Sequence, residues 1–331
     1  MKLTELEFDH FKGLRDITVS CGPGLNILVG RNNAGKSTAL SPLRMLEPTL
    51  RVARRRNPLP FRFAGTKRRG WQIREDGLPV SLENVHTDLL ATPTSVRMAT
   101  DDGGELWLRF PYDGGAFLEA SAPRGPVPSA ASFRRAFPLE LHVCPVIGPV
   151  EHDEPLVRAA TVRRGWGTHR ASRHFRNTWH HFPEHFERFA GMLADTWDGA
   201  HIGPPELHVA LEGAVLHMFV EEGRRPRELY WCGFGLQVWC QLLTWASRVP
   251  EGGIFVVDEP ETYLHPTLQQ RFLEVLRSLG AQVFIATHSA SIVADAHPGE
   301  VLVVDRMAGT VVRPERSGVG LAQQLGMLPR R

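Results

Sequence analysis

The first 50 residues alternate between apolar and polar positions in a pattern that predicts three strands followed by a helix. Residues 3–8 alternate regularly, as a half-buried strand does, and residues 15–19 repeat this alternation. Residues 24–29 are mostly apolar, which indicates a buried strand. A loop containing glycine follows, and the pattern then predicts a helix from Lys36 to about Leu46.

An alternation of strands and helices returns near residue 229. The apolar runs predict helices at residues 236–248, 265–279 and 289–294, and strands at residues 254–257, 283–286, 301–305 and 310–313. Strands that alternate with helices form parallel sheets, so the expected fold class is α/β. We therefore expect one α/β domain, split in sequence between residues 1–50 and 229–315, and a C-terminal tail at residues 316–331.

The segment between these two parts has a different pattern. Proline and glycine are frequent in residues 51–150, and three short alternating runs, at residues 95–98, 105–110 and 139–143, predict a small antiparallel sheet. Residues 151–228 are expected to be mainly helical, including residues 185–197 and 205–221. The sequence thus predicts an insert with a β-rich subdomain followed by a helical arm.

The strongest chemical signal is a complete G-x-x-x-x-G-K-S motif between the predicted buried strand and the helix. It reads Gly30-Arg31-Asn32-Asn33-Ala34-Gly35-Lys36-Ser37-Thr38. In such a P-loop, backbone N–H groups and the helix N-terminus surround an anion. We expect Gly30, Asn32, Asn33, Gly35 and Thr38 to help bind the phosphates of ATP. Lys36 is expected to neutralise the β- and γ-phosphates, and Ser37 to ligate Mg²⁺.

Two further apolar strands end in residues suited to nucleotide hydrolysis. The run at residues 254–257 is followed by Asp258 and Glu259, which is the Walker B pattern. Asp258 is expected to hold Mg²⁺, and Glu259 to act as the general base on the attacking water. The next strand ends in Thr287-His288-Ser289, where His288 is expected to contact the γ-phosphate and position that water.

These motifs together resemble ABC-type ATPases of the RecF, SMC and OLD (overcoming lysogenization defect) group. Asp258-Glu259-Pro260-Glu261-Thr262-Tyr263-Leu264-His265-Pro266 is similar to a run found in OLD-like ATPases, including those of bacterial anti-phage systems. The opening Phe8-Asp9-His10-Phe11-Lys12-Gly13-Leu14 is similar to the start of the same group. The resemblance implies a P-loop NTPase of ABC type in which two copies enclose two ATP molecules.

The resemblance also implies a signature turn that reaches the nucleotide of a partner copy. The candidate lies before the helix predicted at residue 236 and contributes Gly233, Gly235 and Gln237. Phe234 departs from the family pattern, because a small or hydroxyl residue is expected at that position. Gln72, 36 residues after Lys36, is the candidate for the glutamine of the Q-loop, in a segment that reads as a loop.

Basic side chains are concentrated in two segments, although the net charge is only +2. Residues 51–74 contain no acid and nine basic residues: Arg51, Arg54, Arg55, Arg56, Arg62, Lys67, Arg68, Arg69 and Arg74. The second segment adds Arg163, Arg164, Arg170, Arg173 and Arg176, interleaved with Trp166, Phe175 and Trp179. Either segment suits nucleic acid. For the first segment, the alternatives are a solvated face, an interdomain ion-pair surface or contact with ATP. For the second segment, the alternative is an ordinary amphipathic helix whose aromatic side chains belong to the core.

Several classes of protein are disfavoured by the sequence. The longest apolar stretches are far shorter than a membrane-spanning helix, and the acidic N-terminus does not resemble a signal peptide. The four cysteines contain no C-x-x-C pair, which argues against zinc or a disulfide framework and favours a cytoplasmic location. His180, His181 and His185 lack the spacing of a metal motif. A long coiled coil and the TOPRIM nuclease domain of OLD nucleases are also not expected.

The sequence therefore predicts an ATP-hydrolysing switch that forms an ATP-dependent homodimer or higher oligomer. By resemblance to OLD-like ATPases, we expect a sensor in anti-phage defence that acts with a separate effector, a nuclease or a toxin. The main alternative is a RecF-like repair ATPase that binds DNA. A scaffold that holds ATP with little turnover is the second alternative.

Overall fold

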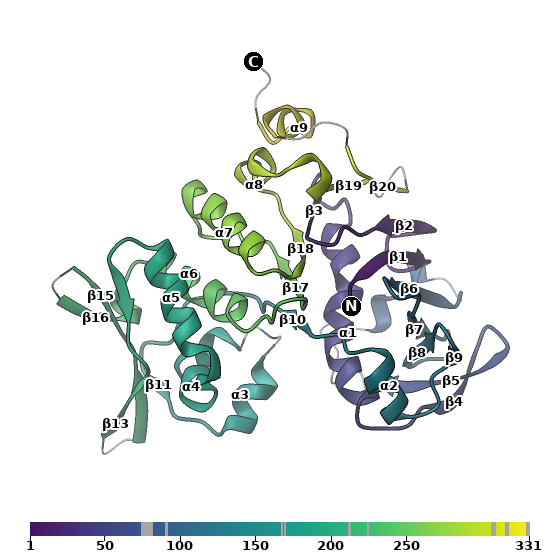
Figure 1. Cartoon of the computed structure of the whole chain (residues 1–331), viewed down its shortest axis with the longest axis horizontal. Coiled ribbons are helices and arrows are strands. Elements are labelled where there is room, and N and C mark those ends of the chain that lie inside the picture. The colour runs from purple at the N-terminus through teal and green to yellow at the C-terminus, as the bar shows by residue number, and fades with distance from the viewer. Residues whose placement is uncertain are drawn as a thin grey trace. The chain divides into compact units, whose positions relative to one another are not determined.

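The computed structural model describes residues 1–73, 82–89, 92–166, 168, 170–210, 213–223, 225–305, 309–314 and 318–328. The chain folds into two compact units, and both are discontinuous in sequence (Figure 1). The first unit combines residues 1–141, 251–259 and 280–331, and the second combines residues 142–250 and 260–279. The units therefore do not follow the segments expected from sequence. Among the described residues, no helix is both long and apolar enough to span a membrane.

A mainly parallel sheet in the first unit carries the P-loop. Its strands lie in the order β10 (Leu141–Val143), β17 (Ile254–Asp258), β18 (Gln282–Ala286), β3 (Leu25–Val29), β19 (Val301–Asp305) and β20 (Thr310–Val312). Strands β17, β18, β3 and β19 run parallel, and β20 runs antiparallel to β19. This arrangement confirms the predicted α/β class. The run predicted at residues 139–143 for the antiparallel sheet of the insert therefore lies at the edge of this sheet instead. Because β3, β17 and β18 are parallel, their carboxyl ends gather the three predicted catalytic segments at one edge.

An antiparallel sheet forms the other half of the first unit. Its order is β2 (Ile17–Ser20), β1 (Leu3–Asp9), β6 (Thr94–Thr100), β7 (Glu105–Phe110), β8 (Ala116–Ala122), β5 (Thr66–Ile73) and β4 (Leu59–Phe63), with β9 (Gly125–Pro126) beside β8. The first two strands of the chain therefore join the sheet of the insert. Alternate residues of β1 and β7 face a core that contains Phe8, Leu108 and Phe110, which explains their period of two.

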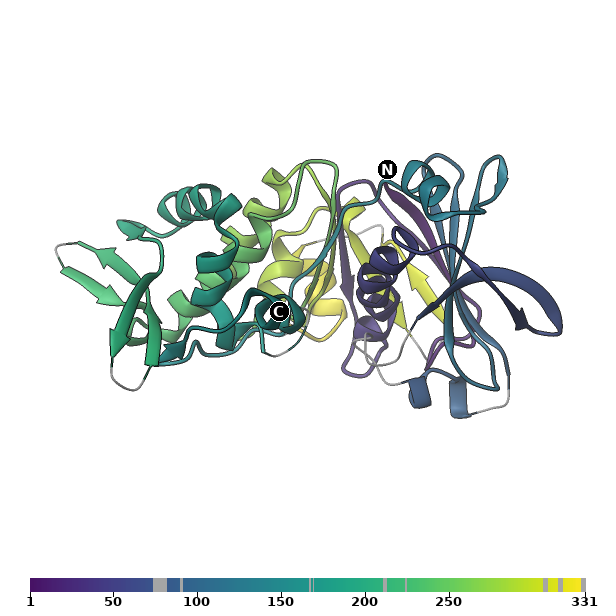
Figure 2. The same ribbon diagram turned by 90° about the horizontal axis from the view of Figure 1, so that it is seen from below.

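Helix α1 (Lys36–Ala53) lies between the two sheets of this unit, with β17 and β18 on one side and β5 on the other (Figure 2). It is seven residues longer than the predicted end at Leu46, despite Pro42 and Pro48 within it. Its leucines are buried along both sheets, and this packing outweighs the hydrogen bonds lost at proline. The unit also contains α2 (Ala130–Ala136), α8 (Ala290–Asp295) and α9 (Val319–Gln324), the last where a tail was expected.

The second unit packs helices against small antiparallel sheets. The chain enters it within β10, after Leu141. Its helices are α3 (Ala159–Gly165), α4 (Phe175–His181), α5 (Phe186–Thr196), α6 (Phe234–Ala246) and α7 (Pro266–Ser278). Its strands are β11 (Glu154–Pro155), β12 (Ala200–Ile202), β13 (Glu206–Ala210), β14 (Gly213–His217), β15 (Phe219–Glu222) and β16 (Arg225–Glu228).

The helix predicted at residues 205–221 is wrong. That segment forms the β13–β14 hairpin and the strand β15 instead. Gly213 has a φ of 134°, a conformation that favours glycine and ends any helix at this point. Apolar Leu207 and Val209 stand two residues apart and are exposed together, which is strand periodicity rather than helical periodicity.

Candidate functional site

The P-loop connects β3 to α1 and leaves backbone N–H groups available to an anion. Asn33 and Gly35 have left-handed φ values of 62° and 97°. Gly35 is the N-cap of α1 and has no side chain to cap the helix, so the first N–H groups of α1 stay available to an anion. A Cβ atom at Gly30 would lie 2.5 Å from the carbonyl oxygen of Val304 on β19. Glycine is therefore required here by the close approach of a neighbouring strand.

Lys36 is folded back across this loop. Its side chain is almost completely buried, with 4% of the residue exposed. Its Nζ donates to the carbonyl oxygens of Gly30 and Arg31, each at 3.1 Å, and lies 3.4 Å from Nδ1 of His288. A buried ammonium held by loop carbonyls stands where a phosphate chain would need neutralising charge.

Ser37 and Asp258 form the group of oxygen atoms predicted to hold Mg²⁺. The Ser37 hydroxyl donates to Oδ1 of Asp258 at 3.1 Å, and Arg44 Nη1 lies 3.3 Å from Oδ2. A hydroxyl and a carboxylate are the hard oxygen donors that Mg²⁺ prefers, so these residues fit the metal. Burial raises the pKa of Asp258, while the Arg44 guanidinium and the Ser37 hydroxyl act in the opposite direction.

Glu259 and His288 complete the site from the ends of two adjacent strands. The backbone N–H of Glu259 donates to the carbonyl oxygen of Ala286 at 2.8 Å, and its φ of 51° turns the chain away from the sheet. Its Oε1 atom then lies 3.5 Å from Nε2 of His288. The imidazole therefore stands between the ammonium of Lys36 and the carboxylate of Glu259, close to both.

The turn that presents His288 is held by its two neighbours. Thr287 is buried, and its N–H donates to the carbonyl oxygen of Leu28 on β3 at 3.1 Å. Ser289 donates its N–H to Thr287 Oγ1, and its own hydroxyl accepts from Ile292 N at the start of α8. His288 is thus fixed between a strand and a helix cap.

The candidate signature turn lies in the second unit, at the start of α6. Gly233 is the N-cap of that helix, and added Cβ atoms at Gly233 and Gly235 would meet nothing within 4 Å. The ring of Phe234 packs edge-on against Tyr263, with centroids 4.6 Å apart. Gln237 is buried and donates to the carbonyl oxygens of Tyr230 and Cys232 at 2.9 and 3.1 Å, so it holds the turn itself.

Two residues differ from the sequence-based expectations. Gln72 lies in strand β5, opposite Phe117 of β8, and not in the loop that the sequence predicted. Its side chain is exposed because it alternates with buried Trp71 and Ile73. Arg44 was not identified from sequence at all, although its spacing of seven from Ser37 places both on one face of α1, a signal that could have found it.

The first basic segment follows α1 away from the P-loop. Helical rise puts Arg54 about 27 Å from Lys36, so the arginines at the end of α1 do not reach the nucleotide at this P-loop. Arg51 forms an ion pair with Glu47, and Arg68 forms one with Glu119. Arg54 donates a hydrogen bond to the carbonyl oxygen of Leu139. On the β4–β5 hairpin, Arg62 stands directly opposite Lys67, both exposed. Arg74 lies outside the described residues.

The second basic segment is partly a core, which is one of the two alternatives that the sequence left open, and its buried members cannot contact nucleic acid. Arg176 is fully buried and bonds to Glu154 and Glu228. Phe175 and Trp179 pack with Phe189 in the interior and cannot stack on bases. Trp166 packs against Phe182 and Trp245 and is only partly exposed. The remaining exposed cations of this segment are Arg163, Arg164, Arg170 and Arg173.

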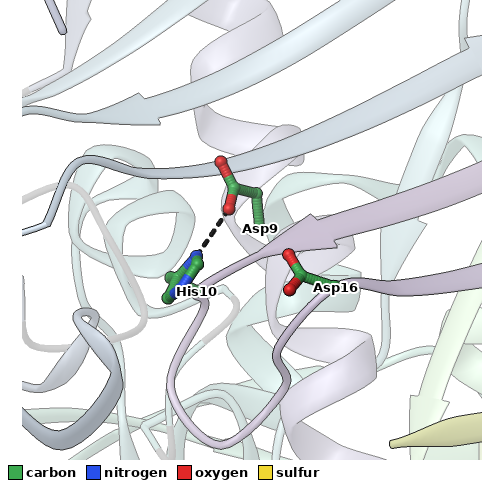
Figure 3. A group of neighbouring side chains, drawn as sticks. All are labelled: Asp9, His10 and Asp16. Carbon is green, nitrogen blue, oxygen red and sulfur yellow. Dashed lines mark hydrogen bonds and ion pairs between the residues drawn. The ribbon is translucent and has the colours of Figure 1, made fainter.

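A separate group of possible metal ligands lies where β1 turns towards β2. The ligand atoms of Asp9, His10 and Asp16 are within 4.8 Å of one another, and His10 Nδ1 is 2.6 Å from Asp9 Oδ1 (Figure 3). Asp9 and Asp16 also border a cavity of about 350 Å³. Arg97 and Arg109 line the same cavity, but their ion pairs are with glutamates: Arg97 with Glu5, Glu7 and Glu105, and Arg109 with Glu119.

Comparisons with known proteins agree with this architecture. Residues 134–294, slightly under half of the chain, match the family described as "AAA domain, putative AbiEii toxin, Type IV TA system". A segment of 49 residues is 43% identical to the DNA replication and repair protein RecF of Limosilactobacillus reuteri (strain DSM 20016). That segment covers 15% of this chain and only 13% of the RecF protein.

Solved structures resemble the chain over nearly its whole length. The SmcHead bound to the C-winged helix domain of ScpA gives a TM-score of 0.59 at 14% identity, covering 94% of this chain and 98% of that one. The recombination mediator protein RecF with ATPrS gives 0.56 at 10% identity, covering 94% and 97%. The Smc head domain from Pyrococcus furiosus bound to the C-terminal domain of ScpA gives 0.56 at 12% identity, covering 98% of each chain. The chain therefore has the mixed α/β fold of ABC-type P-loop ATPase heads.

Proposed function

We propose that this chain binds ATP together with Mg²⁺ and hydrolyses the γ-phosphate bond. The observation that carries the proposal is the convergence of Lys36, Ser37, Asp258, Glu259 and His288 at one edge of the parallel sheet. A structural P-loop with no catalytic role has no need for an acid and an imidazole beside the lysine. Structures of the recombination mediator protein RecF with ATP and with ATPrS are similar to this chain, which supports ATP as the nucleotide.

Each residue has a defined part in the proposed reaction. Lys36 and the N-terminus of α1 bind the phosphates, and Ser37 and Asp258 hold the metal ion. Mg²⁺, when bound, neutralises the charge that develops on the phosphate oxygens. Glu259 accepts a proton from the attacking water, and His288, 3.5 Å from that carboxylate, orients the water against the γ-phosphate.

The proposed cycle includes dimerisation. In this proposal two copies enclose two ATP molecules, and the Gly233–Gly235 turn of each copy contacts the nucleotide of the other. Open space around both glycines supports a close approach by a ligand. The test is the mass of the Glu259→Gln variant by light scattering, with and without Mg-ATP. We expect a dimer only with ATP, and equal monomer content in both conditions would contradict the dimer.

We further propose a role in anti-phage defence with a separate effector. The support is the similarity of the Asp258–Pro266 run to OLD-like ATPases and the toxin named in the matching family description. The test is the plating efficiency of phages on cells that carry the native locus, with the wild-type chain or Lys36→Met. Defence predicts more plaques with the variant, and equal numbers would contradict it.

A second candidate function is nucleic-acid binding, favoured by the β4–β5 hairpin. Like charges directly opposite in a sheet, such as Arg62 and Lys67, are destabilising unless an anion lies over them. Arg55 and Arg56 add exposed charge at the end of α1. Duplex DNA binding that weakens with salt, and that is lost in an Arg62→Glu and Lys67→Glu double variant, would support this function. Equal binding by that double variant would exclude the hairpin as the contact.

A further inference from the structure

Arg44 occupies a position beside the predicted metal ligands that the proposed reaction does not use. It projects from the same face of α1 as Ser37 and Ser41, and its side chain is 21% exposed. Its Nη1 atom lies 3.3 Å from Asp258 Oδ2, while Ser37 donates to Oδ1 of the same carboxylate. Both oxygens of Asp258 are therefore engaged by this chain's own side chains.

A cation at this position stabilises the charged carboxylate of Asp258. Asp258 is largely covered, with 23% of its side chain exposed, and a covered carboxylate requires a neighbouring positive charge. Lys36 points instead into the P-loop, at the carbonyl oxygens of Gly30 and Arg31. Arg44 is thus the residue whose guanidinium is paired directly with Asp258.

A second cation, Lys12, lies near Arg44 and repels its guanidinium. Lys12 Nζ lies 3.5 Å from the Ser41 hydroxyl, and the Lys12 backbone N–H is fixed to the Val85 carbonyl oxygen. Burial lowers the pKa of Lys12, and the nearby Arg44 charge lowers it further. Repulsion from Lys12 therefore favours the arrangement in which the guanidinium points at Asp258.

We propose that Arg44 is a positioning residue that neutralises Asp258 in the metal-free state and releases this carboxylate when Mg²⁺ arrives with the nucleotide. This inference rests on the proposed function. The guanidinium and the metal ion compete for the same carboxylate, because both are cations that need its oxygen atoms. Arg44 consequently raises the Mg²⁺ concentration at which nucleotide binding becomes tight.

The experiment measures binding of a fluorescent ATP analogue while Mg²⁺ is titrated from an EDTA-containing buffer. Arg44→Met keeps the apolar stem of the side chain and removes the charge. We expect the half-saturating Mg²⁺ concentration to fall about threefold to fivefold, which is the effect of losing a partly exposed ion pair. Affinity in EDTA should stay the same, because Lys36 and the loop backbone are unchanged. A midpoint that is unchanged or higher would overturn the inference.

Arg51→Met is the matched control, since Arg51 lies two turns further along the same helix and pairs with Glu47. Its Mg²⁺ midpoint should equal that of the wild type, and an equal fall in both variants would overturn the assignment to Arg44. If Arg44→Met does not fold, Arg44→Gln replaces it with the same readout. Absence of nucleotide binding by the wild-type chain would overturn the proposed function and this inference together. Binding with an unchanged midpoint overturns only the role of Arg44.

Discussion

The hydroxyl of Ser37 donates a hydrogen bond to Oδ1 of Asp258 at 3.1 Å, although 221 residues separate them in the chain. Ser37 stands in the first turn of α1, and Asp258 ends strand β17, which is separated from β3 by β18 alone in the parallel sheet. The sheet therefore brings two distant motifs together at the edge where parallel strands end. This contact joins the phosphate-binding loop to the predicted metal ligand.

Replacing Lys36 by methionine should abolish tight nucleotide binding. The variant loses the ammonium that is held across the loop while it keeps an apolar side chain of similar length. Since phosphate neutralisation depends on that charge, we expect affinity for ATP to fall at least tenfold, or about 1.4 kcal/mol. Equilibrium binding of a fluorescent ATP analogue measures it. Lys67→Met on the exposed hairpin is the control and should bind as the wild type does.

A Gly30→Ala substitution should destabilise the first unit. The new Cβ atom would lie 2.5 Å from the carbonyl oxygen of Val304, so either the loop or strand β19 must move. We expect a loss of roughly 1–3 kcal/mol in the free energy of unfolding. Urea denaturation of Gly30→Ala and of the control Gly24→Ala tests this expectation. Gly24 is a suitable control because a Cβ atom added there meets nothing within 4 Å. Equal stability of the two variants would show that the loop tolerates the clash.

The residues that the parallel sheet brings together at the candidate site could be identified from sequence, and so could helices α5, α6 and α7 of the second unit. The small antiparallel sheets of the second unit could not. The apolar strands at β3, β17 and β18 carry a strong local signal, because a parallel strand is buried on both faces. Within the expected helical arm, the helix at residues 205–221 is wrong, because Gly213 marks a turn that the apolar content of the segment outweighed in the prediction. Arg176 and Trp179 read equally well as a nucleic-acid surface or a core, and only tertiary packing decides between them.

Arg176→Met should strongly destabilise the second unit. Arg176 lies at 0% exposure and bonds to Glu154 and Glu228, so its loss leaves two buried carboxylates without a counter-charge. Breaking a buried ion network in this way costs about 3–5 kcal/mol. Urea denaturation should show this loss. The neighbouring Arg173→Met removes a pair with Glu151 that is 65% exposed on the arginine side, and should cost less than about 1 kcal/mol.

Stability should decrease between pH 6.5 and pH 4 because of His142. Burial, with smaller contributions from His185 and Arg248, lowers the pKa of His142 from 6.5 to about 4. Below pH 6.5 the His142 side chain therefore binds a proton in the unfolded chain but not in the folded chain. The stability that is present above pH 6.5 is consequently lost as the pH falls towards 4. The effect is at most about 2 kcal/mol at pH 5.

Unfolding free energies at pH 7.5 and pH 5 test the role of His142. His142→Gln should show a smaller loss between the two pH values than the wild type. His208→Gln is the control, since its imidazole is about half exposed on the β13–β14 hairpin. An equal pH dependence in wild type and His142→Gln would assign the acid sensitivity to other groups.

In the proposed reaction, this chain hydrolyses ATP with Glu259 as the general base. The most direct measurement is phosphate release from Mg-ATP by the wild type and by Glu259→Gln, with nucleotide affinity measured on the same samples. We predict turnover by the wild type, a loss of about 100-fold or more in the variant, and equal affinity in both. Turnover by Glu259→Gln at the wild-type rate, or no nucleotide binding by the wild type, would contradict the account.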